Sequence, residues 1–404
     1  MADGRMRVLF VAGTQVEVVK LASFYWASWA SNVTIVDPAF ALVAPCGLVA
    51  LSVAAAACGI MCPLVPDAAV SQEHVARQAE WLLDEKRPDV VVVQGSSGTA
   101  LLVAAAARAR GIFIAHVEAG LRAENPAHAD PDDGYGRAIE QMAQLCLCPT
   151  RTAVRAVRES GAYAQAICVG YTGIDMLAAT FGYQIPGAAR RPSWARDVTQ
   201  VPWNAARGNR PRTAAARDEY HILVVLQRRA LLADNRLGDL VAALNALTCA
   251  REIHVRVGLA HLPSDVFRGV HAAVMARPKA TRVQWELVAA PDYAHFVEHL
   301  AWAHGVVTDS GIVQEHAAAM GRAVAAYQPS VERPECVRGP AGAAGGLIEY
   351  GLGRQQLRRR LAETLSWVRP TPSAHRFGAG LAGGRCVRAL LGARDAVAAH
   401  YAAQ

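Results

Sequence analysis

The sequence predicts an α/β protein built from two doubly wound parallel sheets. Short runs of valine, isoleucine and leucine recur without polar alternation, and strands of this kind are covered on both faces, as in a parallel sheet. Helical stretches separate these runs, which is typical of right-handed βαβ units. The alternation occurs on both sides of a stretch rich in proline and arginine, and 404 residues suffice for two domains.

The first half of the chain, residues 1–182, is the predicted N-terminal domain. Its expected strands are residues 6–12, 33–37, 89–94, 112–117 and 166–170. Its expected helices are residues 73–84, 99–110 and 152–160. Because each strand reads as a continuous apolar run, we expect a Rossmann-like sheet with helices on both faces.

A linker and a second domain follow. Residues 183–220 show no apolar period, so we expect an irregular connection there. The alternation resumes in residues 221–375, the predicted second domain. The expected strands are 221–226, 252–257, 283–288, 305–308 and 323–327, and the expected helices are 237–247, 293–303 and 313–320. We expect the two Rossmann-like halves to face a central cleft, with ligands at the carboxyl ends of the strands.

Composition and charge limit the classes of function. Hydrophobic residues make up 53% of the chain and charged residues 19%, which excludes a disordered or fibrous protein. The formal net charge of +7 at pH 7 suits an anionic ligand. The sequence has neither a basic stripe nor an aromatic RNA-binding motif, so no nucleic-acid partner is expected.

Cysteines and apolar segments bear on the compartment. Nine cysteines without a regular framework favour free thiols in the cytoplasm, and no cluster of residues has metal-ligand spacing. The first apolar run ends at a Gly-Thr turn and is expected to be a strand rather than a signal peptide. Residues 38–66 are uncharged, but their prolines and alanines favour a buried or partner-facing helix over a membrane span. A homodimer is therefore expected.

The first predicted strand ends in a candidate anion-binding loop. Gly13-Thr14-Gln15 opens the next helix, and Lys20 follows one turn later. A turn of this kind presents backbone N–H groups to an anion. Many βα turns share this pattern, so the prediction depends on the other strand ends.

Charged residues follow the strand expected at 112–117. Glu118 and Arg122 lie directly after it, and Asp132 and Asp133 follow in a loop expected at residues 124–136. Carboxylates beside an arginine are candidates for proton transfer at a sugar or a phosphate ester. An ordinary solvated acidic loop explains the two aspartates equally well, and both readings stay open.

A second anion-binding turn follows the strand expected at 305–308. Ser310-Gly311 opens a helix whose first N–H groups suit a diphosphate, and Glu315 suits a ribose diol. Another acid and arginine, Glu332 and Arg333, come just after the next strand. The cations expected to reach one cleft are Lys20, Arg122, Arg228, Arg229 and Arg333.

These motifs occur, in order, in one known family. The segments HVEAGLR (116–122), TDSG with QE (308–315), ERPE (332–335) and the arginine pair after HILVVLQ resemble the UDP-N-acetylglucosamine 2-epimerases. So do GYTGID (170–175), PDYAHF (291–296) and FGAGLAGGR (377–385). The resemblance runs from about Met6 to Leu391. It implies the GT-B fold, a UDP-sugar in the cleft, and a C-terminal helix in residues 376–404 that crosses back to the first domain.

The resemblance also implies roles for individual residues. Ser310, Gly311 and Glu315 are expected along the diphosphate and ribose, with Glu332 and Arg333 near them. Phe296 is expected near the uracil, and Glu118 and Asp132 fall on acid/base positions. The full expected set is Glu118, Asp132 and Asp133 as catalytic residues and Gln15, Lys20, Ser96, Arg122, Gln227, Arg228, Phe296, Ser310, Gly311, Glu315, His316, Glu332 and Arg333 as substrate-binding residues.

Several positions depart from the family pattern. The departures are Ser96 for an acid, Gln227 for a histidine, Gln15-Val16 for Arg-Pro, Ile312 for glycine, His316 for an acid, and Tyr135-Gly136-Arg137 for Asn-Arg. Serine and glutamine do not titrate near pH 7, and loss of one general base costs about 10²–10⁴ in rate. The nucleotide half of the site is therefore better preserved than the sugar half.

These departures favour a UDP-sugar-dependent glycosyltransferase, since such a reaction needs one base at most. A hexuronate is one candidate donor sugar, because arginine can bind its carboxylate through two hydrogen bonds. The acceptor would be a nucleobase or another small specialised metabolite. The alternative is a UDP-GlcNAc 2-epimerase, hydrolysing or not, with rearranged catalytic groups. A third reading is an inactive UDP-sugar-binding subunit. None of the three requires a cofactor or a metal.

Overall fold

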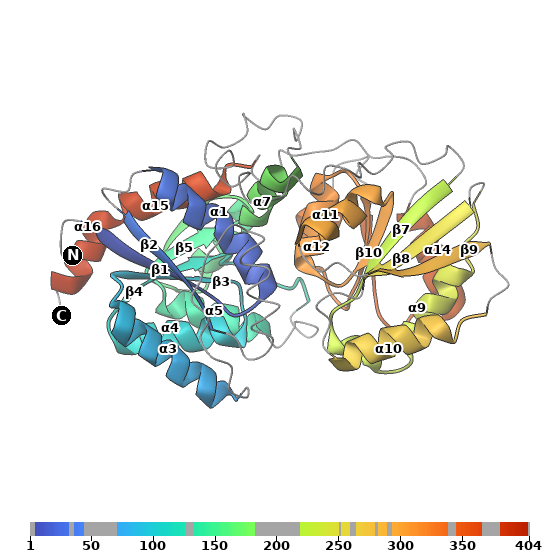
Figure 1. The fold of residues 1–404 in the computed structure, drawn as a ribbon, viewed down its shortest axis with the longest axis horizontal. Helices are drawn as coiled ribbons and strands as arrows, with labels where there is room; N and C mark the ends of the chain where they lie inside the picture. The colour runs from blue at the N-terminus through green and yellow to red at the C-terminus, as the bar shows by residue number, and fades with distance from the viewer. Residues whose placement is uncertain are drawn as a thin grey trace. The chain divides into compact units, whose positions relative to one another are not determined.

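The computed structural model describes most of the chain. The described residues are 5–31, 36–43, 71–125, 132–181, 219–249, 252–258, 264–278, 282–288, 293–337, 345–365 and 380–402. The chain divides into two compact units, residues 1–203 with 377–404 (unit 1) and residues 204–376 (unit 2). Figure 1 shows a sheet flanked by helices in each unit.

Unit 1 contains a six-stranded, fully parallel sheet in the order β2-β1-β3-β4-β5-β6. The strands are β1 (Met6–Ala12), β2 (Val36–Leu42), β3 (Val90–Gln94), β4 (Phe113–Val117), β5 (Leu145–Cys148) and β6 (Gln165–Cys168). The residues of strands β1, β3, β4 and β5 are almost all buried, as expected for continuous apolar strands that are covered on both faces.

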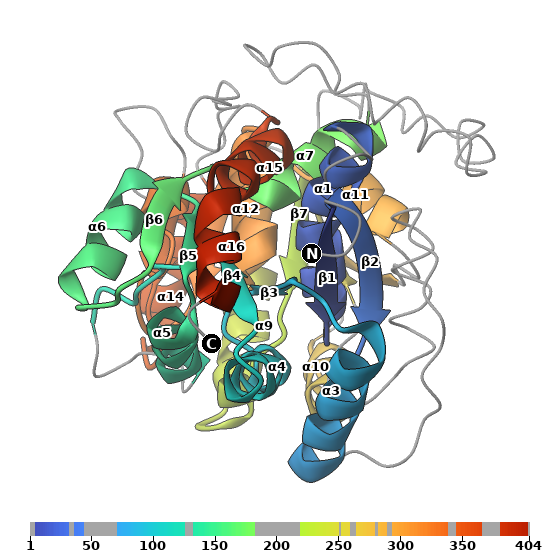
Figure 2. The same ribbon diagram turned by 90° about the vertical axis from the view of Figure 1, so that its left-hand side faces the viewer.

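Helices cover both faces of this sheet (Figures 1 and 2). One face carries α3 (Gln72–Lys86), α4 (Gly98–Ala109) and α5 (Asp132–Met142), and the other carries α1 (Gln15–Ser31), α7 (Thr172–Phe181) and α15 (Ala382–Gly392). The remaining helices are α6 (Arg151–Glu159) and α16 (Arg394–Ala402). Alternate residues of β1 serve the two faces: Leu9 lies in the core beneath α3 and α4, and Phe10 packs edge-on against Phe24 of α1.

Unit 2 repeats this plan with the strand order β12-β11-β10-β7-β8-β9, again fully parallel. The strands are β7 (Glu219–Val225), β8 (Glu252–Gly258), β9 (Val283–Val288), β10 (Gly305–Thr308), β11 (Ala323–Tyr327) and β12 (Gly345–Ile348). The helices are α9 (Arg236–Asn245), α10 (Ser264–Met275), α11 (Tyr293–Trp302), α12 (Gly311–Ala319), α13 (Pro334–Val337) and α14 (Arg354–Thr364), with the short 3-10 helix η4 (Arg229–Leu232). The predicted α/β class with two doubly wound sheets is confirmed.

Each sheet has a switch point, where successive connections leave on opposite sides of the first strand. In unit 1 this point lies between β1 and β3, and in unit 2 between β7 and β10. Ligands of doubly wound folds bind at the carboxyl ends of the strands beside such a point. The loops that end these four strands therefore carry the candidate site.

The structure corrects several local predictions. The segment 124–136, expected as a loop, contains the start of α5 at Asp132, and β12, α7, α10 and α14 were not predicted. Residues 38–42, expected in an uncharged helix, belong to β2. Residues 33–35, residues 44–66 and nearly all of the linker expected at 183–220 lie outside the described residues. The dimer surface expected there stays a prediction.

Within the described ranges, every helix is too short or too polar to cross a membrane.

A buried aspartate joins the C-terminal helices to the rest of unit 1. The carboxylate of Asp175, on α7, accepts hydrogen bonds from the backbone N–H groups of Ala382 and Gly383 at 3.1 and 2.7 Å. Asp175 is 1% exposed, and burial raises its pKa to about 7. The start of α15 is thereby fixed to α7.

We predict that Asp175→Ala destabilises unit 1. The substitution leaves two buried N–H groups without their acceptor, which costs about 2–4 kcal/mol in total. Urea unfolding, with hydrogen exchange of residues 382–392 as a local probe, measures the loss. Unchanged stability together with unchanged exchange at 382–392 would show that Asp175 does not fix α15.

The pH dependence provides a control. The folded state binds a proton that the unfolded state releases near the ordinary pKa of 3.8, so this group's contribution to stability declines as pH rises from about 4 to about 7. Asp175→Asn does not titrate, and the difference between wild type and this variant should change across that window. A pH-independent difference would argue against the raised pKa.

Candidate functional site

A buried ion pair lies at the switch point of unit 1. The Lys20 ammonium, on α1, donates to both carboxylate oxygens of Glu118 at 2.6 Å, and Gln94 Nε2 at the end of β3 donates to Glu118 at 2.8 Å. Lys20 is 1% exposed and Glu118 5% exposed. These hydrogen bonds fix the orientation of the Glu118 carboxylate at the end of β4.

The backbone at Glu118 is strained. Its φ of +62° lies in the left-handed region, which a residue with a Cβ seldom adopts. The Glu118 N–H donates to the Leu147 carbonyl of β5 at 2.9 Å, so the neighbouring strand holds this conformation. Strain of this kind persists only where surrounding contacts compensate for it, and it concentrates at functional sites.

The backbone N–H groups of the loop after β1 are hydrogen-bonded to a side chain of the same chain. The buried Glu17 carboxylate accepts the N–H groups of Gly13 and Thr14 at 2.6 and 3.2 Å and bonds to the Ser97 hydroxyl. Burial raises the Glu17 pKa, although these donors oppose the shift. The expectation that the Gly-Thr turn offers these N–H groups to an external anion is wrong, because Glu17 already uses them. Gln15, beside this loop, is half-buried.

Arg122 has a structural partner. Its guanidinium forms a two-point ion pair with buried Glu140 of α5, at 2.8 and 2.5 Å, and Glu140 also accepts the Gly120 N–H at 2.7 Å. Gly120 has a φ of +85°, and a Cβ there would collide with the Ala153 carbonyl. The glycine and arginine of this motif thus shape the turn after Glu118 and attach it to α5.

The predicted acids Asp132 and Asp133 occupy the first turn of α5. Their side chains lie outside the described part of the structure. The helix reaches the loop after β3, because a Cβ on Gly136 would lie 3.3 Å from the Ser96 Cβ. Ser96 is therefore close to α5, and the catalytic roles of the two aspartates stay predictions.

The switch point of unit 2 is closed by a buried aspartate. The Asp309 carboxylate, directly after β10, accepts the N–H groups of Gln227 and Arg228 after β7 at 2.8 and 2.9 Å. Burial raises the Asp309 pKa to about 6, against the effect of these two donors. Asp309 thus fixes the loop that carries Arg228.

Two arginines and two glutamates alternate beside Asp309. Arg228 pairs with Glu332 at 2.7 Å, Arg333 lies 3.2 Å from Glu332, and Arg333 donates to Glu315 at 2.6 Å. A Cβ on Gly311 would collide with the Arg333 guanidinium, which packs over this glycine. Each of these arginines therefore has a carboxylate partner, and the expectation that these four residues bind a UDP-sugar stays a prediction.

Helix α12 begins beside this network. Ser310 precedes its first turn and makes no side-chain capping bond to any described residue. Tyr293 Oη and His316 Nε2, on α11 and α12, lie 2.5 Å apart, and the Phe296 ring lies 6.2 Å from the His316 ring. Phe296 is half-buried, and His316 is fully buried. The first-turn N–H groups of α12 suit an anion at this strand end.

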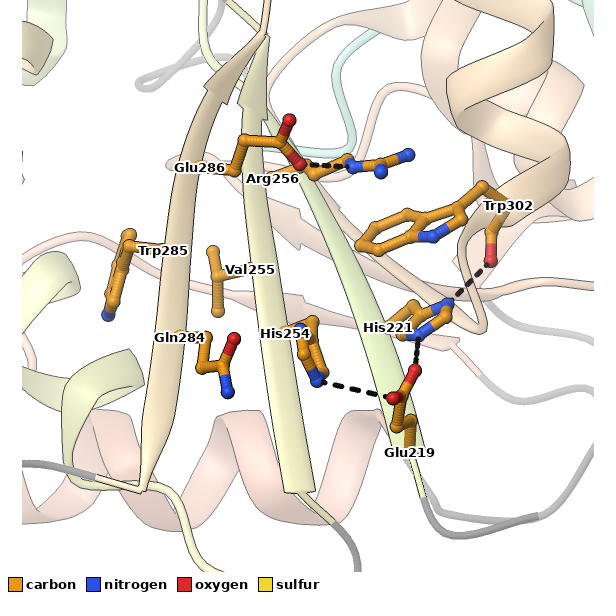
Figure 3. A pocket seen from close by; sticks show the side chains of 9 residues that line it. All are labelled: Glu219, His221, His254, Val255, Arg256, Gln284, Trp285, Glu286 and Trp302. Carbon is orange, nitrogen blue, oxygen red and sulfur yellow. Dashed lines mark hydrogen bonds and ion pairs between the residues drawn. The ribbon is translucent and has the colours of Figure 1, made fainter. Parts of the chain in front are cut away.

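A second polar feature lies away from the strand ends. A hollow of about 360 Å³ is lined by residues of β7, β8 and β9 and by Trp302 (Figure 3). The Trp302 ring stacks on His221 at 4.0 Å and lies 3.9 Å from the Arg256 guanidinium carbon. Glu219 pairs with His221, and Glu286 with Arg256. The contacts of Trp302 attach the end of α11 to the sheet, and none of the predicted site residues lines the hollow.

The predicted residues thus gather at two strand edges. Unit 1 brings Lys20 and Glu118 together, and unit 2 brings together Gln227, Arg228, Ser310, Gly311, Glu315, Glu332 and Arg333. Sequence reasoning missed Glu17, Gln94, Glu140, Tyr293 and Asp309. Asp309 and Gln94 each adjoin a predicted strand end, a position that could have identified them.

Among the residues that the structure describes, no three histidine, cysteine or acidic side chains are grouped so as to hold a metal ion. The common cleft predicted between the two halves stays a prediction.

Comparison with known families and proteins identifies related chains. The family model described as UDP-N-acetylglucosamine 2-epimerase matches residues 67–391. The probable UDP-N-acetylglucosamine 2-epimerase of Ralstonia nicotianae is 27% identical over 263 residues. That alignment covers 63% of this chain and 63% of the relative, slightly less than two thirds of its length. The UDP-N-acetylglucosamine 2-epimerase of Escherichia coli K12 is 25% identical over 327 residues, 76% of this chain and 77% of that protein.

Solved structures show the same fold. The UDP-GlcNAc 2-epimerase from Neisseria meningitidis, solved bound to UDP-GlcNAc, has a TM-score of 0.76 and 19% sequence identity. The match covers 96% of this chain and 100% of that one. The order of elements described above is therefore shared along nearly the whole chain.

We predict that Lys20→Met destabilises unit 1 by about 3–5 kcal/mol, because it leaves the buried Glu118 carboxylate without its cation. The double variant Lys20→Met/Glu118→Gln should lose less than the sum of the two single losses, since the unpaired charge is gone. Urea unfolding of the four proteins measures this coupling.

The exposed pair Arg77–Glu73 on α3 is the matched control. Arg77→Ala should change the free energy of unfolding by about 0.5 kcal/mol or less. Additive losses at Lys20 and Glu118 would contradict a strong buried pair.

Proposed function

The chain belongs to the UDP-N-acetylglucosamine 2-epimerase family, and from this membership we propose that it inverts C2 of the sugar in UDP-GlcNAc to give UDP-ManNAc. The observation that carries the proposal is the Glu118 carboxylate, buried at a strand end and held by Lys20 and Gln94. A carboxylate fixed at a strand end can act as a general base.

The sequence-based preference for a glycosyltransferase was wrong. The family model that matches most of the chain describes 2-epimerases, and relatives that match along the chain bear the same description. The preference counted Ser96 and Gln227 as lost titratable groups. Two neutral side chains do not remove Glu118, whose burial and hydrogen bonds come from residues elsewhere in unit 1.

The proposed chemistry is an elimination followed by addition. A base removes the C2 proton, the C–H electrons form a C1–C2 double bond, and the anomeric C–O bond breaks with its electrons on departing UDP. UDP then adds back at C1 while a proton enters C2 from the opposite face. Both steps are redox-neutral and need no cofactor. Glu118 supports one proton transfer, and Asp132 is the proposed second group.

The loops of unit 2 support binding of the leaving diphosphate. The first turn of α12 offers N–H groups and the positive end of the helix dipole. Arg228, in the loop after β7, carries a guanidinium, whose fork of N–H donors matches the geometry of phosphate oxygens. Donors fixed in place before the reaction stabilise the charge that develops on UDP. Glu315 and Phe296 are proposed to contact the ribose and the uracil.

We predict that Glu118→Gln lowers turnover of UDP-GlcNAc by about 10²–10⁴, because the amide cannot accept the C2 proton. NMR in deuterated water follows deuterium incorporation at C2. UDP affinity, measured by calorimetry, should stay within about threefold, since the diphosphate loops belong to unit 2.

Glu73→Gln on α3, an exposed acid, should retain wild-type turnover. Unchanged turnover in Glu118→Gln would remove Glu118 from the mechanism. Tight UDP binding by wild type without any C2 exchange would reject the 2-epimerase activity itself.

We predict that Arg228→Met weakens UDP binding about 10- to 100-fold, because a charge-assisted hydrogen bond contributes about 1.5–3 kcal/mol. Isothermal titration calorimetry measures the change. The adjacent Arg229 is the matched control, since its side chain is 73% exposed and pairs with Asp265. Arg229→Met should bind UDP within about twofold of wild type. Equal effects of the two substitutions would contradict a specific role for Arg228.

A further inference from the structure

One buried histidine in unit 1 has no role in the proposed chemistry. His116, on β4, is 1% exposed and shares its sheet face with the apolar side chain of Ile114. Placing an imidazole in such surroundings is unfavourable unless its N–H group is hydrogen-bonded. The position of His116 therefore calls for a specific partner.

That partner is the turn between β3 and α4. His116 Nε2 lies 2.7 Å from the Gly95 carbonyl oxygen, which only accepts, so Nε2 carries the proton. Nδ1 is buried and makes no hydrogen bond within the described ranges. Burial lowers the His116 pKa, and Arg122 and Glu140 nearby act in opposite directions. A neutral imidazole that donates from Nε2 accounts for all these contacts.

Three successive residues, 116–118, hold the turn between β3 and α4 through hydrogen bonds. His116 binds the Gly95 carbonyl, the Val117 carbonyl accepts the Gly95 N–H at 2.9 Å, and the Glu118 carboxylate accepts from Gln94. Gly95 has a φ of +71°, a conformation that favours glycine. The same segment thus sets the turn and carries the candidate base.

We propose that His116 is a positioning residue, which holds the Gly95 carbonyl and thereby fixes the turn that follows Gln94, whose amide donates to the candidate base Glu118. This inference rests on the proposed 2-epimerase activity. It assigns His116 no proton transfer to substrate. The contribution of His116 is geometric, because a displacement of about 1 Å in a site can cost about 100-fold in rate.

The test compares His116→Phe with His116→Gln. Phenylalanine fills the space without a donor, and glutamine restores an amide donor near Nε2. We expect His116→Phe to lower kcat for UDP-GlcNAc about 10- to 100-fold, with KM and UDP affinity within about threefold. His116→Gln should recover most of kcat. His74→Phe on α3 is the control and should match wild type.

A second readout does not depend on activity. Hydrogen exchange of residues 94–98 should be faster in His116→Phe than in wild type and close to wild type in His116→Gln. Wild-type kcat in His116→Phe, or equal losses of kcat in both variants, would overturn the inference. If the wild-type protein shows no C2 exchange, the proposed function fails instead. Unchanged exchange at 94–98 in His116→Phe would then still overturn the role of His116.

Discussion

A buried carboxylate at the switch point of each sheet is the interaction on which both candidate loop clusters depend. In unit 1, Glu118 joins α1 and the end of β3, and in unit 2, Asp309 joins the loops after β7 and β10. Parallel strands bring these loops to one edge, but they do not fix the loops against one another. Because a carboxylate has two oxygens, it can accept hydrogen bonds from two elements at once. Each of these carboxylates therefore holds the loops at its sheet edge together.

Internal pairing of charges distinguishes this protein from a simple basic cleft. Arg122, Arg228 and Arg333 each have a carboxylate partner, and Glu17 uses the N–H groups of the first loop. Such pairing holds each guanidinium in one orientation before a ligand arrives, which reduces the entropy lost on binding. It also means that a net charge of +7 says little about the local field at the site.

Most of the fold could be predicted from the sequence because each buried strand is a continuous apolar run that is recognisable locally. The strands β1, β9, β10 and β11 have the predicted bounds. Helix α5 escaped prediction because Gly134 and Gly136 lower its intrinsic helix propensity, which its packing against α4 outweighs. The hydrogen bonds of Asp309 join residues about eighty positions apart in the sequence, so no local sequence pattern predicts them. The transferase preference failed because counting residues at aligned positions ignores the contacts that support Glu118.

The two units differ in how they can form during synthesis. Unit 2 is one continuous stretch of chain, whereas unit 1 includes α15 and α16, which are made after unit 2. Before these helices exist, α1 lacks its neighbour α15 and Asp175 lacks its two backbone donors. Tyr401 of α16 likewise donates to the Asp89 carbonyl, at the start of β3. During synthesis, all residues of unit 2 are therefore made before unit 1 is complete. Unit 1 can complete its packing only after α15 and α16 have been made.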